Sequence, residues 1–345
     1  MQVVIVGGGF CGAFVAKKLD KLPDIQTTLV DRNPYYEYAP SLHKVISDEH
    51  YLKKLRIPFS DFLQNTKIIT DNVIQIEPKK IKTETQEIFF DILVLCPGIS
   101  YPIFLKDTTN VFKLKNGQDA LAITQKIHIA NNLLIVGGGK IGIEIAGEIV
   151  TKFPEKTLTI VHSKNRLLDR NKADAAYYVM KFLRKRGAKI ILNDRIINHK
   201  DNIYYTKSGT KIKADLAFWC AGIQWDTSFM KQFPDDVFAK NGALIVNSHL
   251  QLHQHPHIFV GGDITNIAEE KTGRKAELHA KIIVKNINYL LKNKHLLNYK
   301  QGKSPIVMSL GDWHGILDYK TIIPGVFSIG LLKKAIEWWT LHQLR

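Results

Sequence analysis

Two stretches of the chain, VVIVGGGFCGAFVAKKLDKLPDIQTTLVD (residues 3–31) and LLIVGGGKIGIEIAGEIVTKFPEKTLTIVH (residues 133–162), are copies of one pattern. Each begins with an apolar, β-branched strand, turns through three glycines, continues in a helical segment and ends in a second strand. A single G-x-G-x-x-G motif is a weak signal, but two copies in this context predict two nucleotide-binding units rather than two unrelated tight turns. The matching glycines are Gly7 and Gly137, Gly9 and Gly139, and Gly12 and Gly142.

The three glycines of each copy have separate tasks in binding a dinucleotide. The first permits a tight turn, the second lets backbone N–H groups approach a pyrophosphate, and the third allows the helix to pack closely on the strand. The N-terminus of the helix then stabilises the phosphate charge with its free N–H groups and its dipole. The sequence therefore predicts two bound dinucleotides.

Further apolar strands complete the expected fold. FDILVLCPGIS (90–100) and ADLAFWCAGI (214–223) end in small-residue turns, and IFVGGDIT (258–265) ends in Gly-Gly-Asp. Together with the repeat they predict an α/β fold with two Rossmann-like dinucleotide-binding domains, the second inserted into the first. The expected domains are residues 1–110 with 235–300 for the first, 111–234 for the second, and 301–345 for a C-terminal appendage.

The composition suits a chain with a full hydrophobic core. Of the 345 residues 45% are hydrophobic, and no apolar run reaches the ~18 residues that a membrane span needs. Cys11, Cys96 and Cys220 are far apart, so neither a disulfide framework nor a cysteine-ligated metal site is expected, and a reducing cytoplasm is the simplest location. The 48 Lys and Arg against 32 Asp and Glu give a net charge of +16, which favours nucleic acid, anionic lipid or anionic small molecules as partners.

The order of the motifs resembles that of flavoproteins with two dinucleotide-binding domains and a glutathione-reductase-like architecture. GGGKIGIEIAGEI, PEKTLTIVHS, WCAGI, GGDIT, LHAKIIVKNI and YKQGKSPIVMSLGDWHGI together resemble the ferroptosis-suppressor branch of the apoptosis-inducing-factor-like flavoproteins, whose close relatives are the type II NADH:quinone oxidoreductases. The resemblance covers residues 2 to about 317. It implies FAD in the first domain, NADH or NADPH in the second, and reduction of a quinone through the flavin.

The resemblance also implies a set of cofactor contacts. One of these residues, Asp263, has an alternative interpretation, namely a turn aspartate whose carboxylate hydrogen-bonds its own backbone. The expected FAD contacts are Gly7, Gly9, Phe10 and Gly12 at the pyrophosphate, Asp31 at the adenosine ribose, Arg32 and Val73 at the adenine, Ser41 beside the isoalloxazine, Asp263 at the ribityl chain, and the turn glycines Gly98 and Gly262. The expected NAD(P)H contacts are Gly137, Gly139, Lys140, Ile141, Gly142, Glu144, His162, Ser163, Lys164 and Gly222.

The second copy lacks the acid that usually ends the second strand. His162 stands where the first copy has Asp31. A carboxylate there accepts both ribose hydroxyls and repels a 2′-phosphate, whereas His162, Ser163 and Lys164 remove that repulsion and add donors and positive charge. This predicts a site that takes NADPH alongside NADH. The alternative is that these are solvated loop residues at a strand end.

Two residues are candidates for catalytic roles. Glu144 lies on the first helical turn and could reach the nicotinamide–ribose end, as the family match implies, or be an acid favoured by the helix dipole. His279 lies where the type II dehydrogenases carry a glutamine pair, and could donate a proton to a quinone or be a packed helix residue. YEYAPSLHKVIS offers no redox cysteine, so the flavin itself is expected to take a hydride and pass two electrons to the acceptor.

A histidine-rich segment, SHLQLHQHPHIF (248–259), could suggest a metal. Alternate imidazoles on an extended segment share one side, but no carboxylate or cysteine joins them. No metal site is therefore expected.

The last segment, IGLLKKAIEWWTLHQLR (329–345), fits an amphipathic helix. Paired tryptophans beside lysines suit a helix in an anionic membrane surface, where a quinone is found, and packing on a domain is the alternative. The helical wheel places Leu331, Leu332, Ala335, Ile336, Trp338 and Trp339 on one arc, and Lys333, Lys334, Glu337 and Thr340 on the other.

The leading hypothesis is an FAD-dependent NAD(P)H:quinone oxidoreductase, peripheral on the cytoplasmic face of a membrane. A reductase of a small iron–sulfur or rubredoxin-type protein is a second hypothesis, because a basic surface could dock an acidic protein. A basic flavoprotein that binds nucleic acid is a third, disfavoured because no recognition motif is found. A homodimer is left open.

Overall fold

The computed structural model describes residues 1–319, 322–326 and 328–345. Its first large sheet has the strand order β18-β19-β9-β1-β2-β5, with all neighbours parallel except the antiparallel β18 and β19. Segments that are far apart in the sequence therefore share one sheet. Its strands are β1 (Gln2–Val6), β2 (Gln26–Asp31), β5 (Lys67–Thr70), β9 (Ile92–Leu95), β18 (Gln251–Leu252) and β19 (His255–Val260).

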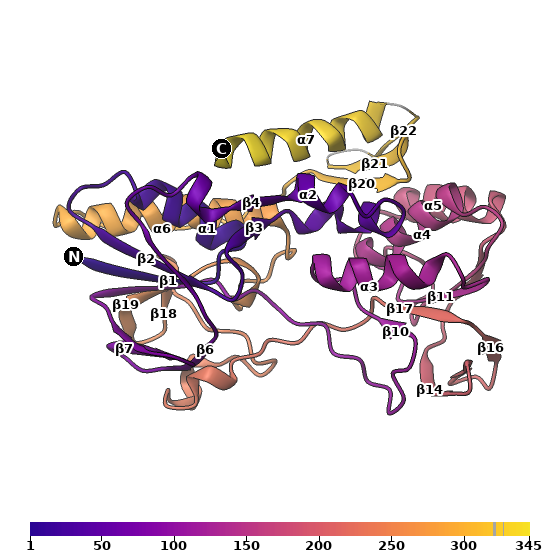
Figure 1. Ribbon diagram of the computed structural model, residues 1–345, viewed down its shortest axis with the longest axis horizontal. Helices are drawn as coiled ribbons and strands as arrows, with labels where there is room; N and C mark the ends of the chain where they lie inside the picture. The colour runs from indigo at the N-terminus through magenta and orange to yellow at the C-terminus, as the bar shows by residue number, and fades with distance from the viewer. Residues whose placement is uncertain (320–321, 327) are drawn as a thin grey trace.

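The second large sheet is parallel throughout, in the order β10-β17-β11-β12-β13. Figure 1 shows the two sheets in opposite halves of an elongated molecule. The predicted α/β class is confirmed, with one mixed and one parallel sheet. The strands are β10 (Val111–Phe112), β11 (Asn132–Val136), β12 (Thr157–Val161), β13 (Lys189–Ile191) and β17 (Leu216–Trp219).

Seven α-helices and five short 3-10 helices are described in residues 1–319, 322–326 and 328–345. The α-helices are α1 (Phe10–Leu19), α2 (Tyr51–Leu55), α3 (Gly117–Ile127), α4 (Lys140–Lys152), α5 (Ala173–Lys185), α6 (Gly273–Leu291) and α7 (Ser328–Leu344). The 3-10 helices are η1 (Ala39–Ile46), η2 (Phe59–Asp61), η3 (Ser228–Met230), η4 (Asp235–Val237) and η5 (Gly262–Ile264).

The structure also contains four small antiparallel sheets. The sequence pattern did not predict them, because their strands are short. They are β3 (Tyr35–Glu37) with β4 (Arg56–Pro58); β6 (Val73–Ile76), β7 (Lys80–Thr83) and β8 (Glu87–Phe89); β14 (Ile196–Lys200), β15 (Ile203–Thr206) and β16 (Lys211–Lys213); and β20 (Ile306–Leu310), β21 (His314–Asp318) and β22 (Ile322–Val326).

The chain passes between the two halves through two adjacent segments. After β9 it leaves the first sheet, and after β17 it returns. Ser100 and Gln224 pair across these segments, with N–H···O distances of 2.8 and 3.0 Å in the two directions. The two crossovers therefore lie side by side.

The C-terminal sheet and α7 pack on both halves. Gly147 of α4 lies so close to Leu310 of β20 that a Cβ would stand 2.7 Å from the Leu310 Cα. Figure 1 shows α7 running along one face of the molecule, from β20–β22 toward α1 and α2. At its end Lys17 of α1 donates a hydrogen bond to the Leu344 carbonyl at 2.7 Å.

α7 buries charged side chains and exposes apolar ones, which is the reverse of an ordinary helix that covers a hydrophobic core. Lys333 and Glu337 are buried against the protein, whereas Trp338 and Trp339 are 63% and 56% exposed. Leu341 and Leu344, which do not fit the apolar arc, are buried in the core of the first half. α7 therefore packs on the protein, as the packing alternative expects, but with its apolar arc outward, and contact of that arc with a membrane stays a prediction. We define the outer face of α7 as Leu331, Leu332, Ile336, Trp338 and Trp339, which are all exposed.

Within the part of the chain that the structure describes, no helix combines the length and the apolar character needed to cross a membrane.

Candidate functional site

Both glycine turns have the same backbone geometry. Gly7 and Gly137 have φ of +93° and +112°, a region that L side chains rarely adopt. Gly7 N–H donates to the Val30 carbonyl at 2.9 Å, and Gly137 N–H donates to the Val161 carbonyl at 2.8 Å. The third glycines are needed for close packing, because a Cβ on Gly12 or Gly142 would collide with the carbonyl oxygen of the first glycine in the same turn.

The middle glycines leave the space that a diphosphate requires. A Cβ on Gly9 or Gly139 would meet no protein atom within 4 Å. These residues also begin α1 and α4, and no side chain caps either helix. The first N–H groups of both helices thus face open space, which makes each turn an anion-binding cradle. The residues present therefore fit a dinucleotide at both turns.

The strand ends of the two copies contact the glycine turns in the same way. The Gly8 N–H donates to Asp31 Oδ2 at 2.6 Å, and the Gly138 N–H donates to His162 Nδ1 at 3.1 Å. Because the Gly138 N–H donates to it, Nδ1 of the buried His162 accepts. The proton of the neutral ring therefore lies on Nε2, 3.4 Å from Asp169. Burial lowers the pKa of His162. His162 is therefore a neutral, buried support of the turn and not a solvated loop residue, whereas Ser163 and Lys164 are exposed, as that alternative expects.

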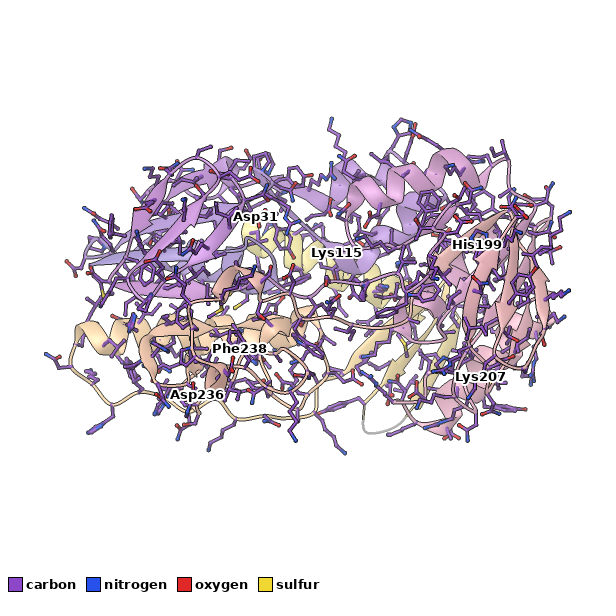
Figure 2. The ribbon with its side chains drawn as sticks, turned by 90° about the horizontal axis from the view of Figure 1, so that it is seen from below. Asp31, Lys115, His199, Lys207, Asp236 and Phe238 are labelled. Atoms are coloured by element: carbon purple, nitrogen blue, oxygen red, sulfur yellow. The ribbon has the colours of Figure 1, made fainter. Side chains whose placement is uncertain are left out.

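A positive cluster lies beside the first strand end. Lys115 is half-buried, and burial together with the nearby Arg32 charge lowers the pKa of Lys115. Figure 2 shows Asp31 and Lys115 in the same region of the molecule. Sequence reasoning missed Lys115, because it lies between the two glycine units and no motif marks it.

Asp263 follows β19 on the short helix η5. Burial raises the pKa of its carboxyl, against the charges of Lys271 and His279. The Trp225 indole N–H donates to the Asp263 backbone carbonyl at 2.9 Å, so the backbone is fixed without using the carboxyl. Within the described residues that carboxyl accepts no hydrogen bond, which leaves it available for ligand hydroxyls.

His279 differs from the expectation that it contacts a quinone directly. It is 1% exposed. Its Nδ1 accepts from the Gly262 N–H at 3.0 Å, and its Nε2 lies 2.9 Å from Glu269 Oε1. Both ring nitrogens are therefore engaged, and direct proton donation would require breaking one of these bonds. The geometry favours the packed alternative, in which His279 fixes the turn that carries Asp263.

Glu269 is the centre of that buried network. It accepts from His279, from Lys275 at 2.7 Å and from Tyr299 at 2.8 Å. Burial would raise its pKa, but these hydrogen bonds lower the pKa of Glu269 to about 2.

We expect Glu269→Gln to lower the melting temperature by roughly 5 °C at neutral pH. Since the folded-state pKa of about 2 lies below the ordinary 4.5, ionised Glu269 stabilises the fold above pH 4.5, and this stability is lost as pH falls through about 2. Melting curves from neutral pH to pH 2 should therefore converge for wild type and variant. A constant difference would contradict this account, and the exposed Glu49→Gln is the control.

A buried polar cluster joins α7 to the segment predicted to lie beside the isoalloxazine. Glu337 accepts hydrogen bonds from Ser41 and from Tyr51, the latter at 2.5 Å. Lys44 Nζ lies 3.3 Å from the Glu337 carboxylate, and both side chains are less than 10% exposed. We call Ser41, Lys44, Tyr51 and Glu337 the α7 lock.

Glu144 is held by a second contact from α7. Lys333 forms an ion pair with Glu144, and the Ser309 backbone N–H donates to the same carboxylate at 3.2 Å. Ser309 also contacts buried His43, at 3.0 Å. Burial, with the charges of Lys333 and Lys44, lowers the pKa of His43 well below its ordinary value, so His43 is neutral. The sequence did not predict that Lys333 reaches Glu144.

A cavity of about 590 Å³ lies where the two halves meet the C-terminal sheet. Its walls come from the segment before β20, the end of β21, the loop before α5 and the first turn of α6. Lys140, at the start of α4, forms an ion pair with Glu270 on one wall. The cavity therefore adjoins the second glycine cradle.

The remaining predicted residues occupy turns and edges. Gly98, Gly222 and Gly262 have φ of +75°, +85° and +77° in the turns after β9, β17 and β19. Val73 begins β6, Phe10 packs against Tyr36 and Tyr38, and Ile141 packs on the core of the second half. Ser163 and Lys164 are exposed beyond β12.

Cys11 and Cys96 are far apart in the sequence, but the structure brings them into contact, with the Cys11 thiol hydrogen-bonded to Cys96. Cys11, Cys96 and Cys220 are free, and burial raises the pKa of Cys11 and raises that of Cys220 to about 12. His257 contacts the Pro78 carbonyl and His249 the Leu297 carbonyl. Among the described residues no group of three or more potential ligands could hold a metal ion.

The fold and the paired cradles define the class of protein: an oxidoreductase that uses FAD and NAD(P)H. The chain belongs to the pyridine nucleotide-disulphide oxidoreductase family, whose model matches residues 1–281. This confirms the predicted cofactors, FAD and NADH or NADPH.

Relatives confirm the resemblance to the apoptosis-inducing-factor-like flavoproteins. The chain is 31% identical to apoptosis-inducing factor homolog B of Dictyostelium discoideum, over 96% of this chain and 93% of that protein. It is 28% identical to ferroptosis suppressor protein 1 of Homo sapiens, over 99% and 96%. Its fold is similar to that of NDH2 from Plasmodium falciparum in complex with NADH, with a TM-score of 0.89, 14% identity, and coverage of 99% and 96%.

Proposed function

We propose that the chain is a peripheral-membrane NAD(P)H:quinone oxidoreductase with FAD. Two Rossmann-like domains, residues 1–110 with 235–300 and residues 111–234, would hold the two dinucleotides, and residues 301–345 would contact acceptor and membrane. The observation that carries the proposal is the pair of open glycine cradles, in a chain whose segment 36–47 carries no redox cysteine. When bound, FAD would supply the redox chemistry by accepting a hydride from NAD(P)H and passing two electrons to the quinone.

The chain's own residues would bind and orient the two nucleotides. The N–H groups at the starts of α1 and α4 neutralise the pyrophosphates. Asp31 and Asp263 present carboxylates to FAD hydroxyls, and Glu144, held by Lys333 and Ser309, positions the nicotinamide–ribose end. The N-terminus of α6, held by the Glu269 network, would offer its helix dipole to negative charge on the bound FAD.

Quinone as the acceptor is supported by two features. The segment YEYAPSLHKVIS carries no redox cysteine, and the buried Cys11 thiol, which contacts Cys96, has its pKa raised well above the ordinary value by burial, so it is a poor relay of electrons to a disulfide substrate. The outer face of α7 gives an apolar surface through which the acceptor region can meet a bilayer, where quinones dissolve. The basic charge of +16 adds attraction to anionic lipid, and the cytoplasmic face of a membrane is the location that we propose.

Trp338→Ser with Trp339→Ser should weaken binding to anionic phospholipid vesicles by about a thousandfold, because burial of each tryptophan contributes roughly 2 kcal/mol. Co-sedimentation with vesicles measures the effect. Phe89→Ser is the matched control, since Phe89 is also 63% exposed but lies on β8, in a different sheet. If wild type and the double variant bind vesicles equally, the proposal that α7 contacts the membrane is wrong.

Stopped-flow absorbance tests the reaction itself. NADH and NADPH should each bleach the yellow flavin, and a short-chain quinone should restore its colour. If a ferredoxin- or rubredoxin-type protein restores the colour and quinone does not, the second hypothesis replaces the first. If no flavin can be bound, the enzyme proposal fails and the nucleic-acid-binding alternative gains.

A further inference from the structure

A second cavity lies at the end of β12, beyond the second glycine turn. It has a volume of about 350 Å³. Its walls carry three cations from three separate segments of the chain: the end of β12, the turn before β14, and the hairpin between β15 and β16. The lining residues are Ser163, Lys164, Asn193, Asp194, Arg195 and Lys207.

Backbone hydrogen bonds fix this cavity beside His162. The Asp194 N–H donates to the His162 carbonyl at 3.2 Å, and the Asn193 N–H donates to the Lys164 carbonyl at 3.0 Å. The Lys207 N–H donates to the Arg195 carbonyl at 2.9 Å, so the hairpin is attached to the same segment. The cations therefore gather where the end of the second strand of a dinucleotide-binding unit meets the adenosine ribose.

The charge of the cavity suits a phosphate. Lys164, Arg195 and Lys207 oppose one carboxylate, that of Asp194. Both Asp194 oxygens already accept hydrogen bonds, from the Ser208 hydroxyl at 2.5 Å and from the Arg195 N–H at 2.9 Å. Burial would raise its pKa, but the hydrogen bonds lower the pKa of Asp194 to about 2, so it is anionic and internally satisfied. Three cations thus face the cavity against one engaged anion.

The groups nearer to the glycine turn are committed elsewhere. His162 Nδ1 accepts from Gly138, and the Arg166 guanidinium donates to the carbonyls of Asp169 and Asn171 at 3.0 and 2.9 Å. The Arg166 guanidinium is thus held by the backbone, and His162 is buried with only Nε2 unpartnered, 3.4 Å from Asp169. The exposed side chains of Arg195 and Lys207 are free to meet a phosphate at the ribose. Figure 2 shows Lys207 and Asp31 in different halves of the molecule.

We propose that Arg195 and Lys207, with Lys164, bind the 2′-phosphate of NADPH and determine how strongly the protein prefers NADPH to NADH. The inference rests on the proposed function, because it requires the reductant to lie in the second cradle. Charge-assisted hydrogen bonds to the phosphate, rather than any contact with His162, would supply the preference. The site would then be assembled from strands outside the strand-turn-helix repeat.

Calorimetric titration of the FAD-bound protein with two small ligands tests this without turnover. Adenosine 2′,5′-bisphosphate and adenosine 5′-monophosphate differ only in the 2′-phosphate. We expect Arg195→Gln and Lys207→Gln each to weaken binding of the bisphosphate about tenfold and to leave binding of the monophosphate unchanged. Lys200→Gln, an exposed lysine of β14 outside the cavity, should change neither.

The outcomes separate the two levels of the proposal. If wild type binds both ligands equally, or if the variants lose affinity for both alike, the phosphate site is wrong while the cradle stands. If neither ligand binds and NAD(P)H does not bleach the flavin, the reductant site itself is wrong. Higher salt should weaken bisphosphate binding more than monophosphate binding, because the phosphate contacts are electrostatic.

Discussion

Gly139→Val is expected to abolish flavin reduction by NAD(P)H while the protein stays folded and yellow. Gly139 has φ of −79°, which any residue adopts, and a Cβ there meets no protein atom within 4 Å. The added side chain would instead occupy the space in front of the first N–H groups of α4, where the pyrophosphate has to lie. We expect a loss of a hundredfold or more in the rate of reduction at fixed NAD(P)H.

Gly9→Val is the matched variant in the other copy. Its backbone is equally ordinary, with φ of −75°, and its Cβ is equally unobstructed. This protein should fold but fail to retain FAD, which absorbance after desalting measures. If both variants bind FAD and react like wild type, neither turn is a phosphate cradle, and the enzyme proposal has no basis.

Glu337→Gln should lower the free energy of unfolding by about 3 kcal/mol, because it leaves the buried Lys44 ammonium without its counter-charge. Urea unfolding followed by circular dichroism measures the change. Limited proteolysis should show α7 released first, since the α7 lock is its main polar attachment to the first half of the molecule.

A double replacement separates charge from packing. Lys44→Met with Glu337→Leu removes both buried charges and should recover most of the lost stability. If Glu337→Gln alone is as stable as wild type, or if the double variant is no better than the single one, the pair is not the source of the stability of α7.

The parts of the site that the sequence predicted are those built from local pattern. The turns at Gly7 and Gly137 are determined by residues within one strand-turn-helix unit, so spacing was sufficient to identify them. Asp31 and His162 could be matched because both end the second strand of a unit. The α/β class followed from the same repeat.

The parts that the sequence missed depend on contacts between distant segments. Helical periodicity predicts two arcs on α7, but it cannot say which arc faces the protein. That choice depends on Lys44 and Tyr51, nearly three hundred residues earlier, which satisfy Glu337. His279 looked available for chemistry because its partner Glu269 carries no motif.

The arrangement of α7 has a mechanical consequence. The two crossovers at Ser100 and Gln224 are not the whole connection between the halves, because Thr124 of α3 also donates to the Val45 carbonyl of η1 at 2.8 Å. α7 is fastened to one half through Glu337 and to the other through Lys333, so it adds a further bridge between them. These attachments restrain relative movement of the halves, so the spacing of the two nucleotide sites is set before either is filled.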